Sequence, residues 1–217
     1  MKKIIIFLLD KKNTWIEKYI LRNKFYEISK KYDLKIKYKI NINEKAEMLF
    51  LLGYTSKFKT SKYKKIKNIF LVHESNLPTG RGWSPVKYQL LANRSKIKCC
   101  LISCEDPIDS GDIYETGTLN IDKTDLYDDI KIKQYKVTIN LITRLIKKYP
   151  NIKSKKQKGK ATWYKKLSSD DDKLNFNESI SSQFNKIRST DYHNYQNYFF
   201  INNKKFYLRI SKKKIIG

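Results

Sequence analysis

The sequence is poor in the residues that bend a chain or carry acid–base chemistry. It has 7 glycines, 4 prolines, 3 cysteines and 2 histidines among 217 residues. The odd number of cysteines and their close spacing, at Cys99, Cys100 and Cys104, exclude a disulfide framework. Both histidines are far from them in the sequence, so no fourth ligand completes a metal site. We predict buried, reduced thiols and no bound metal.

Acidic residues are also scarce. The chain has 21 Asp and Glu against 47 Lys and Arg, a formal net charge of +26. Such an excess is typical of proteins that bind nucleic acids or other polyanions. The lysines are spread over the whole chain, however, arginine is rare, and no stretch matches an RNA-binding or zinc-finger motif. We therefore do not expect nucleic acid as a partner, whereas a phosphate-bearing small molecule suits this charge.

No hydrophobic run is long enough to span a membrane. The longest run near the amino terminus, residues 4–9, is too short for a bilayer. It follows two lysines, as a signal peptide would, but it stops at Asp10 without a small-residue cleavage site. We interpret it as a buried strand, and we expect a cytoplasmic protein.

The hydrophobic pattern predicts an α/β fold. Apolar runs typical of strands cover residues 2–10, 34–40, 47–54, 66–75, 97–103 and 112–121. Helical spacing covers residues 14–32, 84–95 and 125–149, with Thr14 and Ser84 as predicted N-caps. Strands that alternate with helices favour a Rossmann-like, mostly parallel sheet flanked by helices.

A lysine-rich connector after Pro150 divides the chain into two predicted parts. Residues 1–150 form the Rossmann-like domain, and residues 158–217 form a small C-terminal subdomain. The subdomain is predicted to contain a helix and a β-hairpin that turns at Asn202 and Asn203. Its tyrosines and phenylalanines favour a homodimer surface.

The rare residues gather in one stretch, "VHESNLPTGRGWSP" at positions 72–85. It holds His73, two of the seven glycines and two of the four prolines. His73 ends a predicted buried strand, and open α/β sheets bind ligands at the carboxyl ends of their strands. "GRG" lacks the third glycine of a dinucleotide fingerprint and opens no helix after a strand, which excludes NAD. A second polar cluster, "CEDPIDSGDIY", contains Asp109.

These two stretches together resemble the formyltransferases that use N10-formyltetrahydrofolate, a family that includes methionyl-tRNA formyltransferase and the sugar-nucleotide N-formyltransferases. The resemblance implies that His73 and Asp109 are the catalytic pair. The family has an asparagine two residues before the histidine, where this chain has Leu71. We predict that Asn76 takes its role if the loop turns back. The segment from about residue 160 onward is similar to the family as well, including Arg188.

The resemblance also implies where the two substrates bind. For the folate we expect contacts from the loops that follow the strands: Gly53, Tyr54, Leu77, Pro78, Pro107 and Ile108. For the acceptor we expect contacts from Arg81, Gly82, Trp83 and Arg188. Arg81 could pair with a phosphate and Trp83 could stack on a ring, although loop packing explains Trp83 equally well.

The predicted function is formyl transfer from N10-formyltetrahydrofolate, as co-substrate, to an amine of a nucleotide-linked amino sugar. Two alternatives remain open. One is a methionyl-tRNA formyltransferase-like enzyme, although residues 158–217 leave little room for the larger C-terminal barrel of those enzymes. The other is a non-catalytic relative, because Leu71 replaces the usual asparagine.

Overall fold

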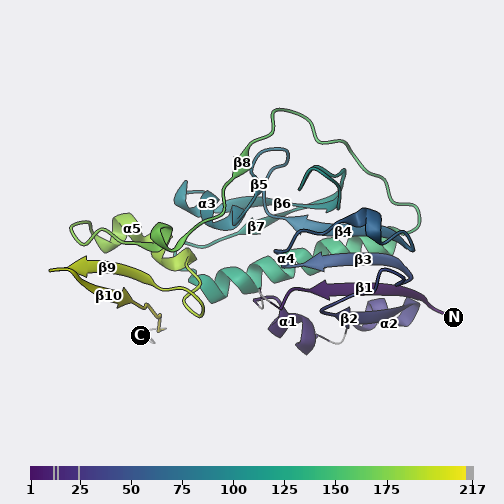
Figure 1. Cartoon of the computed structure of the whole chain (residues 1–217), viewed down its shortest axis with the longest axis horizontal. Helices are drawn as coiled ribbons and strands as arrows, with labels where there is room; N and C mark the ends of the chain where they lie inside the picture. Colours follow the sequence, from purple (N-terminus) through teal and green to yellow (C-terminus); the bar gives the residue numbers. More distant parts are fainter. Residues whose placement is uncertain (12, 14, 24, 214–217) are drawn as a thin grey trace.

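The computed structural model describes residues 1–217 except 12, 14, 24 and 214–217, and its centre is a six-stranded sheet (Figure 1). In sheet order the strands are β2 (Tyr32–Lys37), β1 (Lys3–Leu9), β3 (Ala46–Leu52), β4 (Ile66–His73), β6 (Lys96–Ser103) and β7 (Ile113–Asn120). The first four run parallel, whereas β6 is antiparallel to both β4 and β7. The predicted Rossmann-like, mostly parallel α/β sheet is confirmed.

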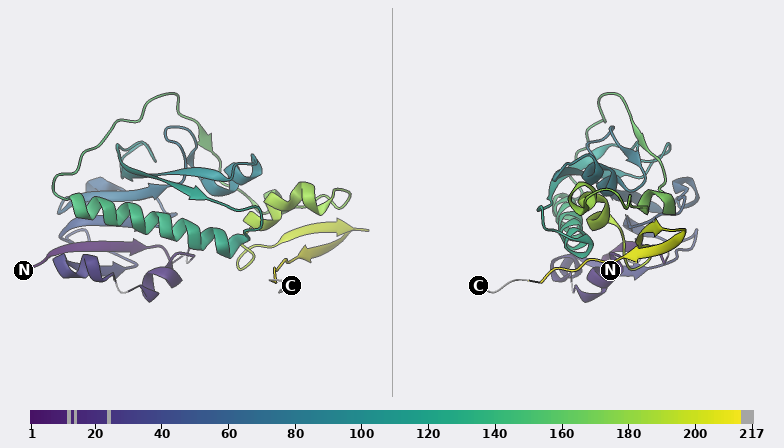
Figure 2. Two further views of the ribbon diagram at one scale, coloured as in Figure 1. Left: turned by 180° about the vertical axis from the view of Figure 1, so that it is seen from behind. Right: turned by 90° about the vertical axis from the view of Figure 1, so that its left-hand side faces the viewer.

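Helices cover one face of this sheet. They are α1 (Glu17–Arg22), α2 (Tyr26–Lys31), α3 (Pro85–Leu91) and α4 (Tyr127–Lys148). Figure 2 shows α4 running the length of the sheet. Alternate strand residues such as Phe7, Phe50 and Phe70 point to this face and form the main core with Leu141 and Leu145 of α4. Among the helices that the structure describes, none combines the length and the apolar composition needed to cross a membrane.

Loops cover the opposite face, and the site lies there. Leu8, Leu51 and Leu71 pack on this face against side chains of the segment that joins β3 to β4, including Phe58. Successive residues of a strand point to opposite faces, so Leu71 and His73 of β4 share this one. The pairing of His73 with Cys100 of β6 places the histidine at the border of the parallel and antiparallel parts of the sheet.

The helix predicted over residues 14–32 is two helices. The backbone of Phe25 is left-handed, with φ of 45°, and its N–H donates to the side chain of Asn23 at 3.0 Å. The Phe25 ring packs edge-on against Phe7 with centroids 5.3 Å apart, and this burial holds the break. The predicted N-cap Thr14 lies outside the described residues. Ser84 does precede α3, but its side chain makes no capping hydrogen bond.

The part of the chain beyond α4 adds an extended segment, residues 150–164, which we call the strap, and then a helix and a hairpin. The segment after α4 crosses above the sheet in Figure 1 and forms β8 (Trp163–Tyr164), which pairs in parallel with β5 (Arg81–Gly82). Short 3-10 turns lie at Thr60–Lys62 (η1) and Ser169–Asp172 (η2). Helix α5 (Ile180–Ser189) precedes the hairpin of β9 (Asn197–Ile201) and β10 (Lys204–Leu208). The predicted C-terminal helix and hairpin are therefore present, and Asn202 and Asn203 at the turn both have positive φ.

The cysteines are free, as the sequence predicts. Cys99 and Cys100 are buried in β6, and burial raises the pKa of both thiols. Burial also raises the pKa of half-buried Cys104, to about 12, with a further contribution from nearby Asp109. Because the thiolate is the reactive form, we expect the native protein at about pH 8 to react slowly with Ellman's reagent, and all three thiols to react in urea. Rapid reaction of the native protein would contradict this expectation.

Candidate active site

His73, the last residue of β4, is the centre of the site. It is 5% exposed, and its Nε2 lies 2.7 Å from the carbonyl oxygen of Gly80. A carbonyl oxygen only accepts hydrogen bonds, so the proton on Nε2 is inferred from this partner. The Nδ1 atom of the same ring lies 3.4 Å from Oδ2 of Asp109. The ring is therefore held between a carbonyl and a carboxylate.

Asp109 reaches His73 from the loop between β6 and β7. The loop turns back over the sheet, with Asp109 in a left-handed conformation (φ of 56°) that aspartate tolerates better than most residues. The carboxylate is 6% exposed, and its Oδ2 accepts a hydrogen bond of 2.8 Å from the backbone N–H of Gly82. The structure thus brings together two residues that are remote in sequence, in a buried position where a proton can pass between them.

The strap fixes both loops that carry this pair. The amide nitrogen of Gln157 donates to the carbonyls of Asp109 and Gly111, each at 2.8 Å. The amide oxygen of Gln157 accepts from Nη2 of Arg81 at 2.6 Å. The loop of His73 is held a second time by Thr162, whose hydroxyl accepts from the Gly80 N–H at 2.8 Å. One side chain of the strap therefore joins the loop after β4 to the loop after β6.

Comparison with known proteins gives matches in sequence and in fold. No family model matches the chain. The methionyl-tRNA formyltransferase of Malacoplasma penetrans is 28% identical over 142 residues, which cover 63% of this chain and 44% of that protein. Among solved structures, the methionyl-tRNA formyltransferase from Clostridium thermocellum matches 98% of this chain and 94% of its own, with a TM-score of 0.82 and 20% identity. The chain is thus similar in sequence to methionyl-tRNA formyltransferases and shares its fold with one of known structure.

A further solved structure that matches this chain contains two bound ligands. The N-formyltransferase from Helicobacter canadensis, solved in complex with folinic acid and dTDP-3-aminofucose, covers 94% of this chain and 85% of its own, with a TM-score of 0.67 and 20% identity. The chain spans less than half the length of the Malacoplasma relative. These matches establish the fold, whereas the reaction and the substrates of this chain are matters for proposal.

The residues predicted to contact the folate lie on both sides of the His73–Asp109 pair. Leu51 of β3 pairs with Leu71, and two residues further along the two parallel strands come Gly53 and His73. Gly53 has a φ of 60°, and Tyr54 is half-buried against Phe58.

On the other side, Ile108 next to Asp109 is 55% exposed, and Pro107 before it is exposed as well. Leu77 and Pro78 are buried beneath the loop. Of the residues predicted to contact the folate, Pro107 and Ile108 are therefore exposed, whereas Leu77 and Pro78 are buried.

The predicted acceptor contacts do not form one group. Arg81 and Trp83 lie on the loop beside the pair, where Arg81 also packs over the ring of Trp163. Lys166 lies over the ring of Trp83. Arg188 instead is 6% exposed and donates to the carbonyl of Asp122 at 2.6 Å, so it links α5 to the turn after β7. A substrate role for Arg188 stays a prediction.

Asn76 is not joined to the His73–Asp109 pair. The residue is exposed, and its carbonyl accepts from the Thr79 N–H within a tight turn. In the described parts of the chain, no hydrogen bond joins its amide to His73 or Asp109. Leu71, at the position of the family asparagine, packs against Leu77 and its neighbours in the sheet and offers no donor.

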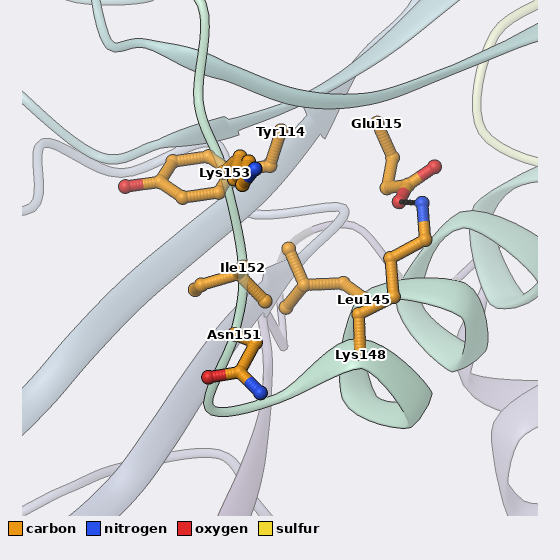
Figure 3. Close-up of a pocket in the computed structure, with 7 residues that line it drawn as sticks. All are labelled: Tyr114, Glu115, Leu145, Lys148, Asn151, Ile152 and Lys153. Atoms are coloured by element: carbon orange, nitrogen blue, oxygen red, sulfur yellow. Dashed lines mark hydrogen bonds and ion pairs between the residues drawn. The ribbon is translucent and has the colours of Figure 1, made fainter.

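Two surface pockets lie apart from the pair. One of about 170 Å³ lies between β7, the end of α4 and the start of the strap, where Lys148 pairs with Glu115 (Figure 3). The other lies between α5 and the end of α3. His73 and Asp109 line neither of them. Within the described ranges, no group of three or more His, Cys, Asp or Glu side chains is arranged to hold a metal ion.

Gln157 was not predicted from the sequence, because it lies in a lysine-rich run whose composition is typical of a solvated linker.

Replacing Gln157 with alanine removes both the donor to two carbonyls and the acceptor for Arg81. We expect the strap to loosen and trypsin to cleave at its lysines several-fold faster. Any activity that depends on the pair is expected to fall about 10-fold, because the variant loses two hydrogen bonds to backbone carbonyls and one from the charged Arg81. Asn151→Ala at the exposed start of the strap is the control; equal cleavage rates would contradict the role of Gln157.

Proposed function

We propose that the chain transfers a formyl group from N10-formyltetrahydrofolate to an amine of a nucleotide-linked amino sugar. The observation that carries the proposal is the buried His73–Asp109 pair, 3.4 Å apart at the end of β4. Support for the substrates comes from the Helicobacter canadensis N-formyltransferase, whose complex contains folinic acid and an amino-sugar nucleotide. In the proposed arrangement residues 1–150 carry the chemistry, and residues 158–217 form a small C-terminal subdomain.

The residues beside the pair fit a formyl-folate. Exposed Ile108 offers an apolar contact next to Asp109, and Gly53 follows β3 two residues beyond the Leu51–Leu71 pair, level with His73 in the neighbouring strand. When bound, the co-substrate supplies a formyl carbon whose bond to nitrogen breaks as the acceptor amine forms its own bond to that carbon. One proton leaves the amine, and one reaches the departing folate nitrogen.

His73 and Asp109 handle these protons in the proposed reaction. Oδ2 of Asp109 can take the proton that the acceptor amine loses, either directly or through Nδ1 of His73. The Gly82 N–H holds Oδ2 in place, and the Gly80 carbonyl holds the ring through Nε2. Because both groups are buried, their charges act with little screening by water. Arg81, beside the pair, supplies a guanidinium for a phosphate of the acceptor.

Acceptor assays test the proposal. The purified protein is incubated with N10-formyltetrahydrofolate and a panel of nucleotide-linked 3-amino and 4-amino sugars. We expect one of them to gain the mass of a formyl group, with release of tetrahydrofolate. Tetrahydrofolate release with none of the sugars would overturn the proposed acceptor.

A second candidate function is formylation of methionyl-tRNA, which is supported by the sequence similarity to the methionyl-tRNA formyltransferase of Malacoplasma penetrans. Charged initiator tRNA therefore belongs in the same assay, together with a gel shift. Formyl-methionyl-tRNA as the product would favour this candidate over the sugar. A chain that binds folinic acid but formylates neither acceptor would be the non-catalytic relative that Leu71 suggests.

A further inference from the structure

Ser75 has a buried hydroxyl that the fold does not use. The residue is 2% exposed, and its Oγ is the one buried side-chain oxygen or nitrogen in the described part of the chain that has no hydrogen-bond partner. Buried polar groups are almost always paired, because an unpaired one loses its bonds to water without replacement. Such a group in a native structure therefore points to a partner that arrives from outside the chain.

Ser75 lies beside the catalytic pair. It follows His73 by two residues, in the loop that leaves β4 and returns to the imidazole at Gly80. Its carbonyl accepts from the thiol of Cys100 at 3.3 Å, and Cys100 is the residue that pairs with His73 across the sheet. The loop thus wraps Ser75 against the same part of the sheet as the imidazole.

The reaction proposed above needs a donor at this place. When an amine adds to a formyl carbon, negative charge moves onto the formyl oxygen, and positioned donors stabilise it. Nε2 of His73 is bound to the Gly80 carbonyl, and Leu71 is apolar. Asn76 is exposed, and the Arg81 guanidinium is bound to Gln157, so none of these four side chains fills the role. Asp109, with its buried carboxylate, is an acceptor. A hydroxyl can donate one hydrogen bond in whichever direction it rotates.

We propose that the Ser75 hydroxyl donates a hydrogen bond to the oxygen of the formyl group as that oxygen gains charge. This inference rests on the proposed formyl transfer and adds a residue to it. It assigns the donor role to Ser75, in place of the exposed Asn76. The partner it requires is a carbonyl oxygen that becomes more negative during the reaction, which is a property of formyl transfer to any amine acceptor.

The Ser75→Ala variant separates this role from a structural one. If the hydroxyl is unused by the fold, its removal will leave the ligand-free protein as stable as before or raise Tm by about 2–4 °C. At the same time kcat will fall about 100-fold, whereas KM will change little, because the bond strengthens as charge develops. The Ser75→Cys variant, of similar size and with a weaker donor, is expected to lie between the two in kcat.

Ser84→Ala is the matched control, since Ser84 is an exposed serine of the same loop region whose side chain makes no capping bond. We expect it to change neither kcat nor Tm. An unchanged kcat in Ser75→Ala would overturn the proposal and indicate a buried water as the partner. A lower Tm with kcat and KM altered together would also overturn it and indicate a structural role. Failure of formyl transfer itself is recognised separately, because the wild-type protein would then formylate no acceptor.

Discussion

Replacing Asp109 with asparagine will lower kcat/KM for formyl transfer by at least about 100-fold while the fold is retained. The reason is chemical, since positioned general acid–base groups contribute about 10²–10⁴-fold and an amide cannot take a proton at this position. The fold is retained because the amide oxygen of asparagine can still accept from the Gly82 N–H. His73→Ala is expected to have an effect of the same order. Activity is measured by tetrahydrofolate release, and folding by thermal unfolding.

The chain offers a matched control for this experiment. His193 and Asp128 form a second histidine–aspartate pair with the same 3.4 Å separation, but the two side chains are 51% and 37% exposed. Because water screens this pair and it lies outside the loops of the site, His193→Ala should leave kcat/KM close to the wild-type value. Equal activity of Asp109→Asn and wild type would show that the buried pair is not the catalytic one.

Replacing Gly111 with alanine will lower the free energy of unfolding by about 3 kcal/mol and abolish formyl transfer, because forced overpacking displaces the backbone. A Cβ at this position would lie 1.9 Å from the carbonyl oxygen of Ser103, far inside van der Waals contact. That contact is with backbone, so it cannot be relieved by rotating a side chain. The carbonyl of Gly111 also accepts from Gln157, so any shift reaches the loop that carries Asp109.

Gly159→Ala isolates the steric part of this effect. Gly159 has a φ of 109°, which alanine adopts only with strain, but no atom lies within 4 Å of an added Cβ. We expect Gly159→Ala to lower the free energy of unfolding by about 1 kcal/mol, from backbone strain alone. The measurement is urea unfolding of both variants beside the wild type. A Gly111→Ala variant no less stable than Gly159→Ala would contradict the close approach to Ser103.

The parts of the fold that local pattern determines could be predicted from the sequence. Strand β1 is a continuous apolar run, α4 has acidic residues in its first turn and lysines in its last, and Asn202–Asn203 suits a turn with two positive φ angles. The position of His73 at the end of β4 followed from the same reasoning, since the apolar run stops there.

The parts that depend on tertiary contact could not be predicted. Phe25 breaks a helix because its ring packs on Phe7, and no local signal marks that contact. The two-residue pairing of β5 with β8 is too short to leave a pattern. The role of Gln157 depends on three groups distant from it in sequence, and the unpaired state of Ser75 is a property of the folded interior alone.

The strap also determines when the site is completed during synthesis. All strands of the six-stranded sheet lie before residue 121, so they are translated before Gln157 and Thr162. Until those residues arrive, the carbonyls of Asp109 and Gly111 lack their common donor, and Gly80 lacks the Thr162 hydroxyl. A nascent chain that ends before Gln157 can thus contain every strand of the sheet together with His73 and Asp109, but the loops that carry this pair are fixed only after the strap has been added.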